Sequence, residues 1–244
     1  MARARPRQES KAAVRGEGAQ KALAPSPQRL AQLLRRQYGL PTRREPQGLI
    51  ASVVRTILSQ NTTGRNADAA YEELRAKFPD WHAVASARLR SLASSLRRSG
   101  LANKRARVIR EVVRRLLEEG SEARVEQRLR AMSTEEVLEF LQSFDGIGPK
   151  TAACVALFEL GRDVFPVDTH ILRISNRLGW VRPEASAEEA QRLLEPLIPP
   201  SLRFQLHVNL INHGRRVCRP NKPECPTCVL CPLCAAARGG TIGK

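Results

Sequence analysis

Apolar residues recur at intervals of three and four along most of the chain, which is the spacing typical of amphipathic α-helices. The clearest run predicts a buried helix over residues 47–59 and consists of Leu49, Ile50, Val53, Val54, Ile57 and Leu58. A shorter run predicts a helix that starts near residue 27 and ends before Gly39. The same period predicts further helices over residues 65–77, 84–97, 103–118, 134–143, 149–160, 169–178, 187–196 and 201–214.

Helix boundaries are marked by the polar and turn-forming residues between these segments. Ser133 followed by Glu136 forms a capping-box pattern in front of the helix expected over residues 134–143. Proline and glycine fall mostly between the segments, and no segment convincingly alternates apolar and polar residues as a strand does. We therefore predict an all-α protein.

The net charge of the chain indicates that it binds a polyanionic partner. Lys and Arg number 41 against 24 Asp and Glu, which gives a formal net charge of +17. Nucleic acid is the usual partner of so basic a protein. Residues 1–26 read as a disordered basic tail without the apolar core of a secretory signal. With no apolar run long enough to span a membrane, we expect a cytoplasmic protein, associated with the nucleoid if the source is bacterial.

A candidate phosphate site lies between two of the predicted helices, at Gly146-Ile147-Gly148. Two glycines so close together let the backbone turn tightly and approach another molecule. Pro149 suits the first position of the helix that follows. The N–H groups of such a turn can hold a phosphate, although similar turns also serve as plain connectors.

Lys150 and Asp168 are candidates for covalent chemistry on a sugar. A neutral lysine amine can attack C1′ of deoxyribose and form a Schiff base. A helix N-terminus, neighbouring cations and burial would each favour the neutral amine. Asp168 is expected to be the N-cap of the helix that starts near Thr169, where an ionised carboxylate could stabilise positive charge on the sugar. Taken singly, each residue is more often an ordinary helix-start residue.

Five of the six cysteines crowd into the segment from Cys218 to Cys234, which indicates a metal site. Six, two and five residues separate Cys218, Cys225, Cys228 and Cys234. From this spacing alone, a structural zinc ion and an iron–sulfur cluster are equally plausible. Cys231 lies inside the last gap and permits another ligand set, whereas Cys154 reads as a core residue.

These motifs together resemble the endonuclease III-type DNA glycosylases of the helix-hairpin-helix, Gly/Pro-Asp superfamily. The resemblance rests on residues 141–153, on Val167-Asp168-Thr169-His170 and on the cysteine spacing, and it covers residues 28–235. It implies two helical lobes with a DNA-binding cleft between them. One lobe would be a six-helix barrel over residues 42–162 that ends in the hairpin motif. The other would join residues 27–41 to residues 163–244 and hold the cluster.

The resemblance also implies roles for single residues. Lys150 matches the Schiff-base nucleophile and Asp168 the catalytic aspartate, while the four spaced cysteines match the ligands of a [4Fe–4S] cluster. Gln60 matches a glutamine that fills the gap left by a flipped nucleotide, and Leu101 an apolar wedge between stacked bases. Gln60 could equally be a helix C-cap and Leu101 a loop anchor. His170 could face the pocket, but a core or surface histidine is nearly as plausible.

The function expected from these features is base excision repair by a monomeric glycosylase with lyase activity. It would remove oxidised pyrimidines from double-stranded DNA, or act at abasic sites, through a lysine Schiff base. A monofunctional glycosylase for mismatched or alkylated bases, and a non-catalytic DNA-binding module with a structural metal, are the alternatives. Residues 61–64, Asp145 and Pro149 differ from the sequence common in the family, and Trp180 follows the helix that starts near Thr169. Because these positions flank the expected pocket, the preferred lesion could differ.

Overall fold

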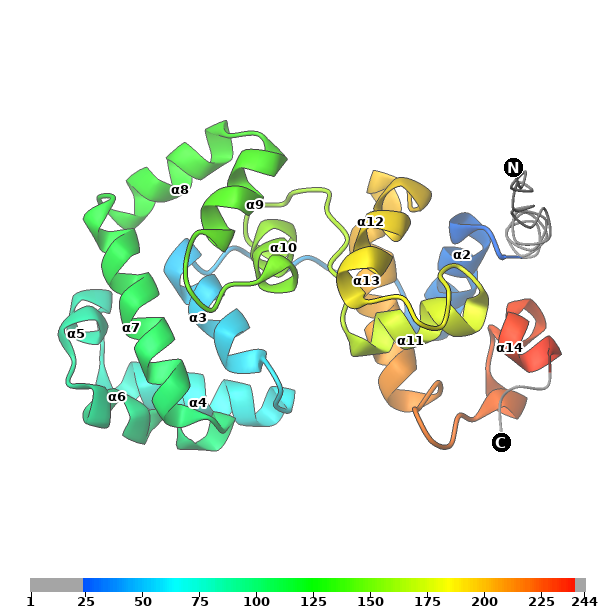
Figure 1. Cartoon of the computed structure of the whole chain (residues 1–244), viewed down its shortest axis with the longest axis horizontal. Helices are drawn as coiled ribbons and strands as arrows, with labels where there is room; N and C mark the ends of the chain where they lie inside the picture. The colour runs from blue at the N-terminus through cyan, green and yellow to red at the C-terminus, as the bar shows by residue number, and fades with distance from the viewer. Residues whose placement is uncertain (1–23, 240–244) are drawn as a thin grey trace, which may run out of the picture. The chain divides into compact units, whose positions relative to one another are not determined.

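The computed structural model describes residues 24–239, so most of the predicted basic tail over residues 1–26 lies outside the described residues. Within this range the chain forms thirteen α-helices and three short 3₁₀ helices, and it contains no strand (Figure 1). The predicted all-α class is therefore confirmed. None of the described helices is both long and apolar enough to cross a membrane.

The chain divides into two compact units. The hairpin unit is Thr42–Pro166, and the cysteine unit joins Met1–Pro41 to Val167–Lys244. The hairpin unit contains α3 (Leu49–Ser59), α4 (Gly64–Lys77), α5 (Trp81–Ser86), α6 (Leu89–Ser95), η1 (Arg97–Ser99), α7 (Ala102–Glu118), α8 (Glu122–Ala131), α9 (Thr134–Gln142) and α10 (Pro149–Phe158). The cysteine unit contains α2 (Pro27–Tyr38), α11 (Thr169–Leu178), α12 (Ala187–Leu197), α13 (Pro200–Arg216), η2 (Cys225–Thr227), η3 (Cys231–Leu233) and α14 (Ala235–Arg238).

Helix α3 is the central helix of the hairpin unit. It packs against α4, α7, α8 and α10, and its apolar side chains are buried as the sequence predicts. Val53, Val54 and Leu58 have no exposed surface at all. Helix α9 packs against α10, so the two helices of the hairpin motif are joined directly to this core.

The N-terminus of α3 is capped by carboxylates from distant parts of the same unit. Its N-cap, Gly48, has no side chain to offer. Glu159 accepts hydrogen bonds from Gly48 N at 2.9 Å and Gln47 N at 3.3 Å, and Glu122 accepts one from Ile50 N at 2.8 Å. These carboxylates satisfy backbone N–H groups that would otherwise have no partner, so they fix α3 relative to α8 and α10.

One predicted helix is wrong, because residues 84–97 are not continuous. The segment forms α5, α6 and η1, and the chain is extended at Ala87 and Arg88 between the first two. Asp80 starts α5 earlier than predicted by accepting a hydrogen bond from Ala83 N at 2.7 Å. Both helices then pack against α7, which buries Val84 and Leu92. The apolar spacing continues across the break, and for this reason the sequence gives no sign of it.

Helix α8 was not predicted, because it has only two buried apolar residues, Val125 and Leu129. Its remaining positions are mostly charged, so the helical period is weak. Ser121 nevertheless caps it by accepting a hydrogen bond from Arg124 N at 3.3 Å. The capping box predicted for α9 is present, with both reciprocal hydrogen bonds between Ser133 and Glu136.

In the cysteine unit, α13 packs against α2 and α11. Two amide side chains of α13 bind backbone carbonyl groups of α2 and of the residue that follows it. Gln205 donates to Ala31 O at 2.8 Å, and Asn209 donates to Gly39 O at 3.1 Å. The N-terminal helix is thereby built into the same unit as the cysteine loop.

Candidate nucleic-acid and catalytic site

The turn of the hairpin motif is shaped by Gly146. Its φ of +88° lies in the left-handed region, and a Cβ there would lie 2.7 Å from Val108 Cγ1. Both the conformation and the close approach of α7 therefore require glycine. At Gly148, by contrast, a Cβ would meet nothing within 4 Å, so this end of the turn is open.

The structure narrows the part of the turn that can hold a phosphate. The side chain of Ile147 is buried, and its N–H is already donated to Phe144 O at 3.0 Å. Neither group can reach a ligand, so the prediction that Ile147 contributes to the cradle needs correction. Gly148 is the N-cap of α10 and makes no side-chain cap. The N–H groups of the first turn of α10 are therefore the ones available to an anion.

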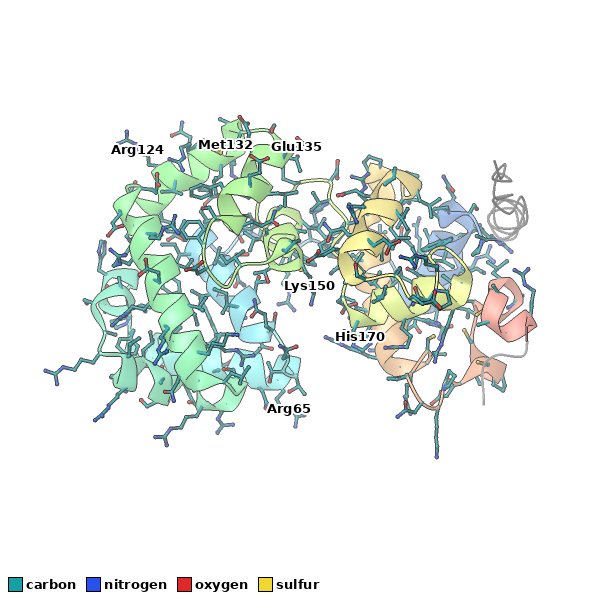
Figure 2. All side chains as sticks on the ribbon, viewed as in Figure 1. Arg65, Arg124, Met132, Glu135, Lys150 and His170 are labelled. Carbon is teal, nitrogen blue, oxygen red and sulfur yellow. The ribbon has the colours of Figure 1, made fainter. Side chains whose placement is uncertain are left out.

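Lys150 lies in this first turn, and its side chain is exposed (Figure 2). Burial within the hairpin unit, one of the three effects expected to favour the neutral amine, is therefore absent. The position at a helix N-terminus remains. The amine is open to a ligand that binds at the hairpin.

The structure brings Gln60 to the residues around Lys150. Gln60 is the C-cap of α3, as its alternative reading predicts, but its side chain points to the hairpin. Its Nε2 donates to Thr151 Oγ1 at 3.0 Å and to Gly146 O at 3.4 Å. Helix α3 and the hairpin motif are thus joined by a polar side chain adjacent to the candidate nucleophile.

Leu101 stands at the start of α7 and is 62% exposed, so it does not anchor its loop in the core. Its φ of 49° is in the left-handed region, which is unusual for a leucine. Arg105, one turn further along α7, donates to Ser99 O, to Gly100 O and to Gln60 O. The loops that carry Gln60 and Leu101 are therefore linked through one guanidinium.

In the cysteine unit, Asp168 is the N-cap of α11, as the sequence predicts. Its Oδ1 accepts a hydrogen bond from Ile171 N at 2.8 Å. His170, two residues later and labelled in Figure 2, is half-buried against α13, where a Cβ on Gly214 would lie 2.8 Å from the His170 Cβ. Arg173 Nη2 lies 3.1 Å from His170 Nδ1. Burial lowers the pKa of His170, and the charge of Arg173 acts in the same direction against that of Asp168.

The cysteine loop consists of three consecutive turns of equal length. Cys228 N donates to Cys225 O at 3.2 Å, Cys231 N to Cys228 O at 3.0 Å, and Cys234 N to Cys231 O at 3.1 Å. These cysteines, together with Cys218, line one hollow of the cysteine unit. Its lining comprises Val217, Cys218, Pro223, Glu224, Cys225, Cys228, Cys231, Cys234 and Ala237.

Burial makes three of the thiols in this hollow poor acids on their own. It raises the pKa of Cys228 to about 11 and also raises the pKa of Cys225 and of Cys234. Thiolates in such a place need a compensating positive charge. Arg177 offers one, since its Nη1 donates to Cys218 Sγ at 3.1 Å, and a bound metal would supply more.

The cysteines of this hollow suit a metal group that binds several thiolates. A cuboidal iron–sulfur cluster is larger than a zinc ion and needs its cysteines spread around it. Five cysteine side chains around one hollow meet that need. Cys154 is not among them and lies on α10, in the hairpin unit.

His213 supports the hollow from α13, a feature that sequence reasoning missed. It is buried, and its Nδ1 lies 2.9 Å from the Tyr38 hydroxyl, while its Nε2 lies 3.4 Å from Cys228 Sγ. Burial lowers its pKa to about 4. A neutral ring that accepts from Tyr38 carries its proton on Nε2 and directs it at the sulfur.

Arg105, Arg173 and Arg177 were also missed. Arg173 and Arg177 hold the start of the cysteine loop through the carbonyls of Cys218, Arg219 and Pro220. Their spacing of four on α11 indicates a common face, but the sequence does not show what lies opposite. Trp180, predicted to flank the pocket, instead donates from Nε1 to Pro25 O at 2.7 Å and secures the start of α2.

Comparisons with known proteins agree with this arrangement. The family model described as "HhH-GPD superfamily base excision DNA repair protein" matches residues 54–200, more than half of the chain. A protein of Arabidopsis thaliana provisionally named a DNA glycosylase is 39% identical over 171 residues, which are 70% of this chain and 58% of that protein. Endonuclease III of Thermotoga maritima is 33% identical over 70% of this chain and 75% of its own length.

Solved structures share the fold. A trapped covalent intermediate of endonuclease III with DNA superposes with a TM-score of 0.75 at 24% identity, over 89% of this chain and 99% of that one. A thermostable thymine-DNA glycosylase superposes with a TM-score of 0.72 at 18% identity, over 87% and 97% of the two chains. At these identities the likeness concerns the fold alone.

Proposed function

The chain belongs to the HhH-GPD superfamily of base excision DNA repair proteins, and we propose that it is a DNA glycosylase with abasic-site lyase activity. The observation that carries the proposal is the position of Lys150. It is an exposed amine in the first turn of α10, directly after an open hairpin turn, with Gln60 bound to the adjacent Thr151. Phosphate binding at the turn and attack on the nearby sugar would then use neighbouring residues.

In the proposed reaction the neutral amine of Lys150 attacks C1′ of a flipped nucleotide. The bond between C1′ and the base nitrogen breaks, and the base leaves with the bonding electrons and takes up a proton. The bound amine then gives up a proton, the C1′–O4′ bond of the sugar ring breaks, and O4′ keeps the bonding electrons and takes up a proton, which leaves a protonated Schiff base between Nζ and C1′. Removal of a C2′ proton forms a double bond to C3′ while the C3′–O bond breaks and the phosphate leaves. Water finally hydrolyses the imine and frees Lys150.

Asp168 is proposed to stabilise the positive charge that develops on the sugar as the base leaves. A carboxylate held by a backbone N–H is fixed in place before the reaction, so it need not reorganise.

For the substrate, we propose oxidised pyrimidines in double-stranded DNA, acted on by a monomer. The net charge of +17 supports a DNA partner. The oxidised-pyrimidine class rests on the resemblance of the motifs to endonuclease III-type glycosylases. The relative named DNA glycosylase/AP lyase ROS1, 31% identical over 59% of this chain, supports the lyase step. A panel of duplexes, each with a single lesion, would test the class directly.

We further propose that Cys218, Cys225, Cys228 and Cys234 hold a [4Fe–4S] cluster. When bound, this group supplies iron centres that bind the four thiolates. Arg177 and His213 would then direct their N–H groups at Cys218 and Cys228, while Arg173 fixes the backbone of Cys218. The end of α13, with Arg215 and Arg216, and the loop that follows it, with Arg219 and Lys222, would thereby be held in one shape for contact with DNA phosphates.

Borohydride trapping on duplex DNA with an abasic site tests the proposed chemistry. Borohydride reduces a Schiff base to a stable amine, so the wild-type protein should become covalently linked to DNA. Lys150→Gln should abolish the link, whereas Lys104→Gln, which removes an equal charge from an exposed lysine of the same unit, should preserve it. Undiminished trapping by Lys150→Gln would overturn the assignment of the nucleophile.

The same experiment separates the alternatives. A monofunctional glycosylase would release a damaged base without forming the covalent link. A non-catalytic module would bind the duplex, release no base and form no link.

A further inference from the structure

Arg105 connects two loops that are distant in the sequence. It lies in the first turn of α7 and is 4% exposed. One nitrogen of its guanidinium, Nη1, donates to Ser99 O and Gly100 O, the latter at 2.8 Å, and the other, Nη2, donates to Gln60 O. The three acceptors are all backbone carbonyls, so the contact fixes the course of the chain.

Backbone strain is found at the same places. Among residues 24–239, the non-glycine residues with positive φ are Asn61 and Leu101, both at 49°. Each directly follows a carbonyl that Arg105 binds, on Gln60 and on Gly100. Conformations of this kind persist where surrounding contacts hold them, and they are frequent at functional sites. Asparagine adopts this conformation readily, whereas leucine rarely does. The guanidinium therefore holds the Leu101 loop in a shape that its sequence alone would not favour, and it ties the Gln60 loop to it.

The side chains carried by these loops are not fixed in the same way. Leu101 points an apolar side chain into solvent. The amide of Gln60 is held by Thr151 and, at a longer 3.4 Å, by Gly146, both of which it could leave for another partner. Arg105 thus fixes the backbone below two side chains that can still move.

We propose that Arg105 is a positioning residue that holds the Gln60 and Leu101 loops at one spacing, so that the two side chains enter the DNA duplex together. This inference rests on the proposed function, in which Gln60 fills the space of the flipped nucleotide and Leu101 separates the stacked bases. If only one of the two side chains entered the duplex, either the space of the flipped nucleotide or the separated base step would have no protein side chain to fill it. A rigid spacing lets both insertions contribute to one flipping step.

A buried arginine can also serve stability alone, and Arg105→Lys separates the two roles. Lysine keeps the charge and three donors, but its ammonium is a single point and not a planar fork. It can reach carbonyls of one loop but not both, so the core stays filled while the loops are uncoupled. Arg107→Lys is the matched control, because Arg107 is exposed on the same helix.

The first measurement follows base unstacking by 2-aminopurine fluorescence, with the fluorescent base beside a tetrahydrofuran abasic analogue in a duplex. This analogue cannot form a Schiff base, so the readout does not depend on Lys150. Arg105→Lys should slow the fluorescence rise by about tenfold or more, and Arg107→Lys should change it by less than about twofold. In parallel, borohydride trapping on single-stranded DNA with an abasic site, which needs no unstacking, should stay within about twofold of wild type for both variants.

An equal loss of unstacking and single-strand trapping would mean that Arg105 is merely structural, and an unchanged fluorescence rate would overturn the proposal outright. Absence of trapping by wild type, with the fluorescence effect intact, would instead overturn the proposed lyase chemistry alone.

A second measurement needs no change at Arg105, in case its variants fail to fold. Gln60→Ala, Leu101→Ala and the double variant form a cycle in which the unstacking rate is compared. If Arg105 makes the side chains act together, each single variant should slow unstacking nearly as much as the double variant. Multiplicative effects of the two single variants would contradict the proposed coupling.

Discussion

The amide of Gln60 donates to the hydroxyl of Thr151 at 3.0 Å, and Thr151 is the residue next to Lys150. If Gln60 fills the space of a flipped nucleotide, this hydrogen bond must break when DNA binds. Thr151→Val, which keeps the shape and removes the acceptor, should lower the free energy of unfolding by about 1 kcal/mol. Binding to a duplex with an abasic analogue should not weaken, since the lost bond belongs to the DNA-free state alone.

Urea unfolding and fluorescence anisotropy measure these two quantities. Gln60→Ala is the comparison, and it should weaken binding because the filling side chain is gone. If Thr151→Val weakened binding as much as Gln60→Ala, the contact would support the bound state, and the proposed exchange of partners would be wrong.

The contact between Gln60 and Thr151 also shows where sequence reasoning stops. The helices were predictable wherever several apolar residues repeat, as in α3, and caps were predictable where donor and acceptor are three residues apart, as for Asp168 in α11. These features depend on local spacing. Gln60, Arg105 and Thr151 meet through the packing of three helices, and no local pattern encodes that meeting.

The errors have the same origin. The chain becomes extended at Ala87 because two short helices pack against α7, although the apolar period continues through it. Cysteine spacing indicated a metal site, but only the fold shows that Cys231 lines the same hollow as the four cysteines of the family pattern. The sequence places Arg173 on one face of a predicted helix. The carbonyl of Cys218 that it binds is 45 residues away in the sequence, so no local pattern predicts this contact.

The capping of α3 by Glu159 predicts a large effect from a residue outside the site. Glu159→Ala leaves Gln47 N and Gly48 N without their acceptor, and Glu159 is itself only 5% exposed. We expect the free energy of unfolding to fall by about 2 kcal/mol in chemical denaturation. Glu118→Ala, which removes an exposed carboxylate paired with Arg114, should cost less than about 0.5 kcal/mol. Equal effects of the two variants would contradict the role of Glu159.

The lowered pKa of His170 predicts a pH dependence of stability. Burial is its main cause, so the folded protein binds a proton at His170 less readily than the unfolded chain does. As pH falls below the ordinary histidine value of about 6.5, the unfolded state therefore takes up more protons and stability decreases. Thermal unfolding between about pH 7 and pH 5 should show a smaller decrease for His170→Gln than for wild type. Parallel curves would show that His170 does not contribute.

The proposed ligand set predicts different outcomes for two cysteines of the same hollow. Cys228→Ser should lower the iron content and the visible absorption of anaerobically purified protein, because a cluster ligand is lost. Cys231→Ser should leave both near wild type, because Cys231 lies outside the proposed set. Iron loss in Cys231→Ser with retention in Cys228→Ser would exchange their assignments. A wild-type protein with zinc and no iron would overturn the cluster.

Asp168 has a structural and a proposed catalytic role, and these can be separated. Asparagine caps a helix about as well as aspartate, so Asp168→Asn should keep the hydrogen bond to Ile171 N and unfold within about 0.5 kcal/mol of wild type. Single-turnover base release should nevertheless fall by about 100-fold, because the negative charge is lost. Asp168→Ala should lose activity and also about 1 kcal/mol of stability.

The matched control is Asp80→Asn, which makes the same change at the N-cap of α5, where Asp80 accepts from Ala83 N at 2.7 Å. It should leave base release at the wild-type rate, since Asp80 serves α5 alone. If Asp168→Asn were as active as Asp80→Asn, the carboxylate of Asp168 would be no more than a helix cap. The negative charge that stabilises the positive sugar as the base departs would then have to come from another residue.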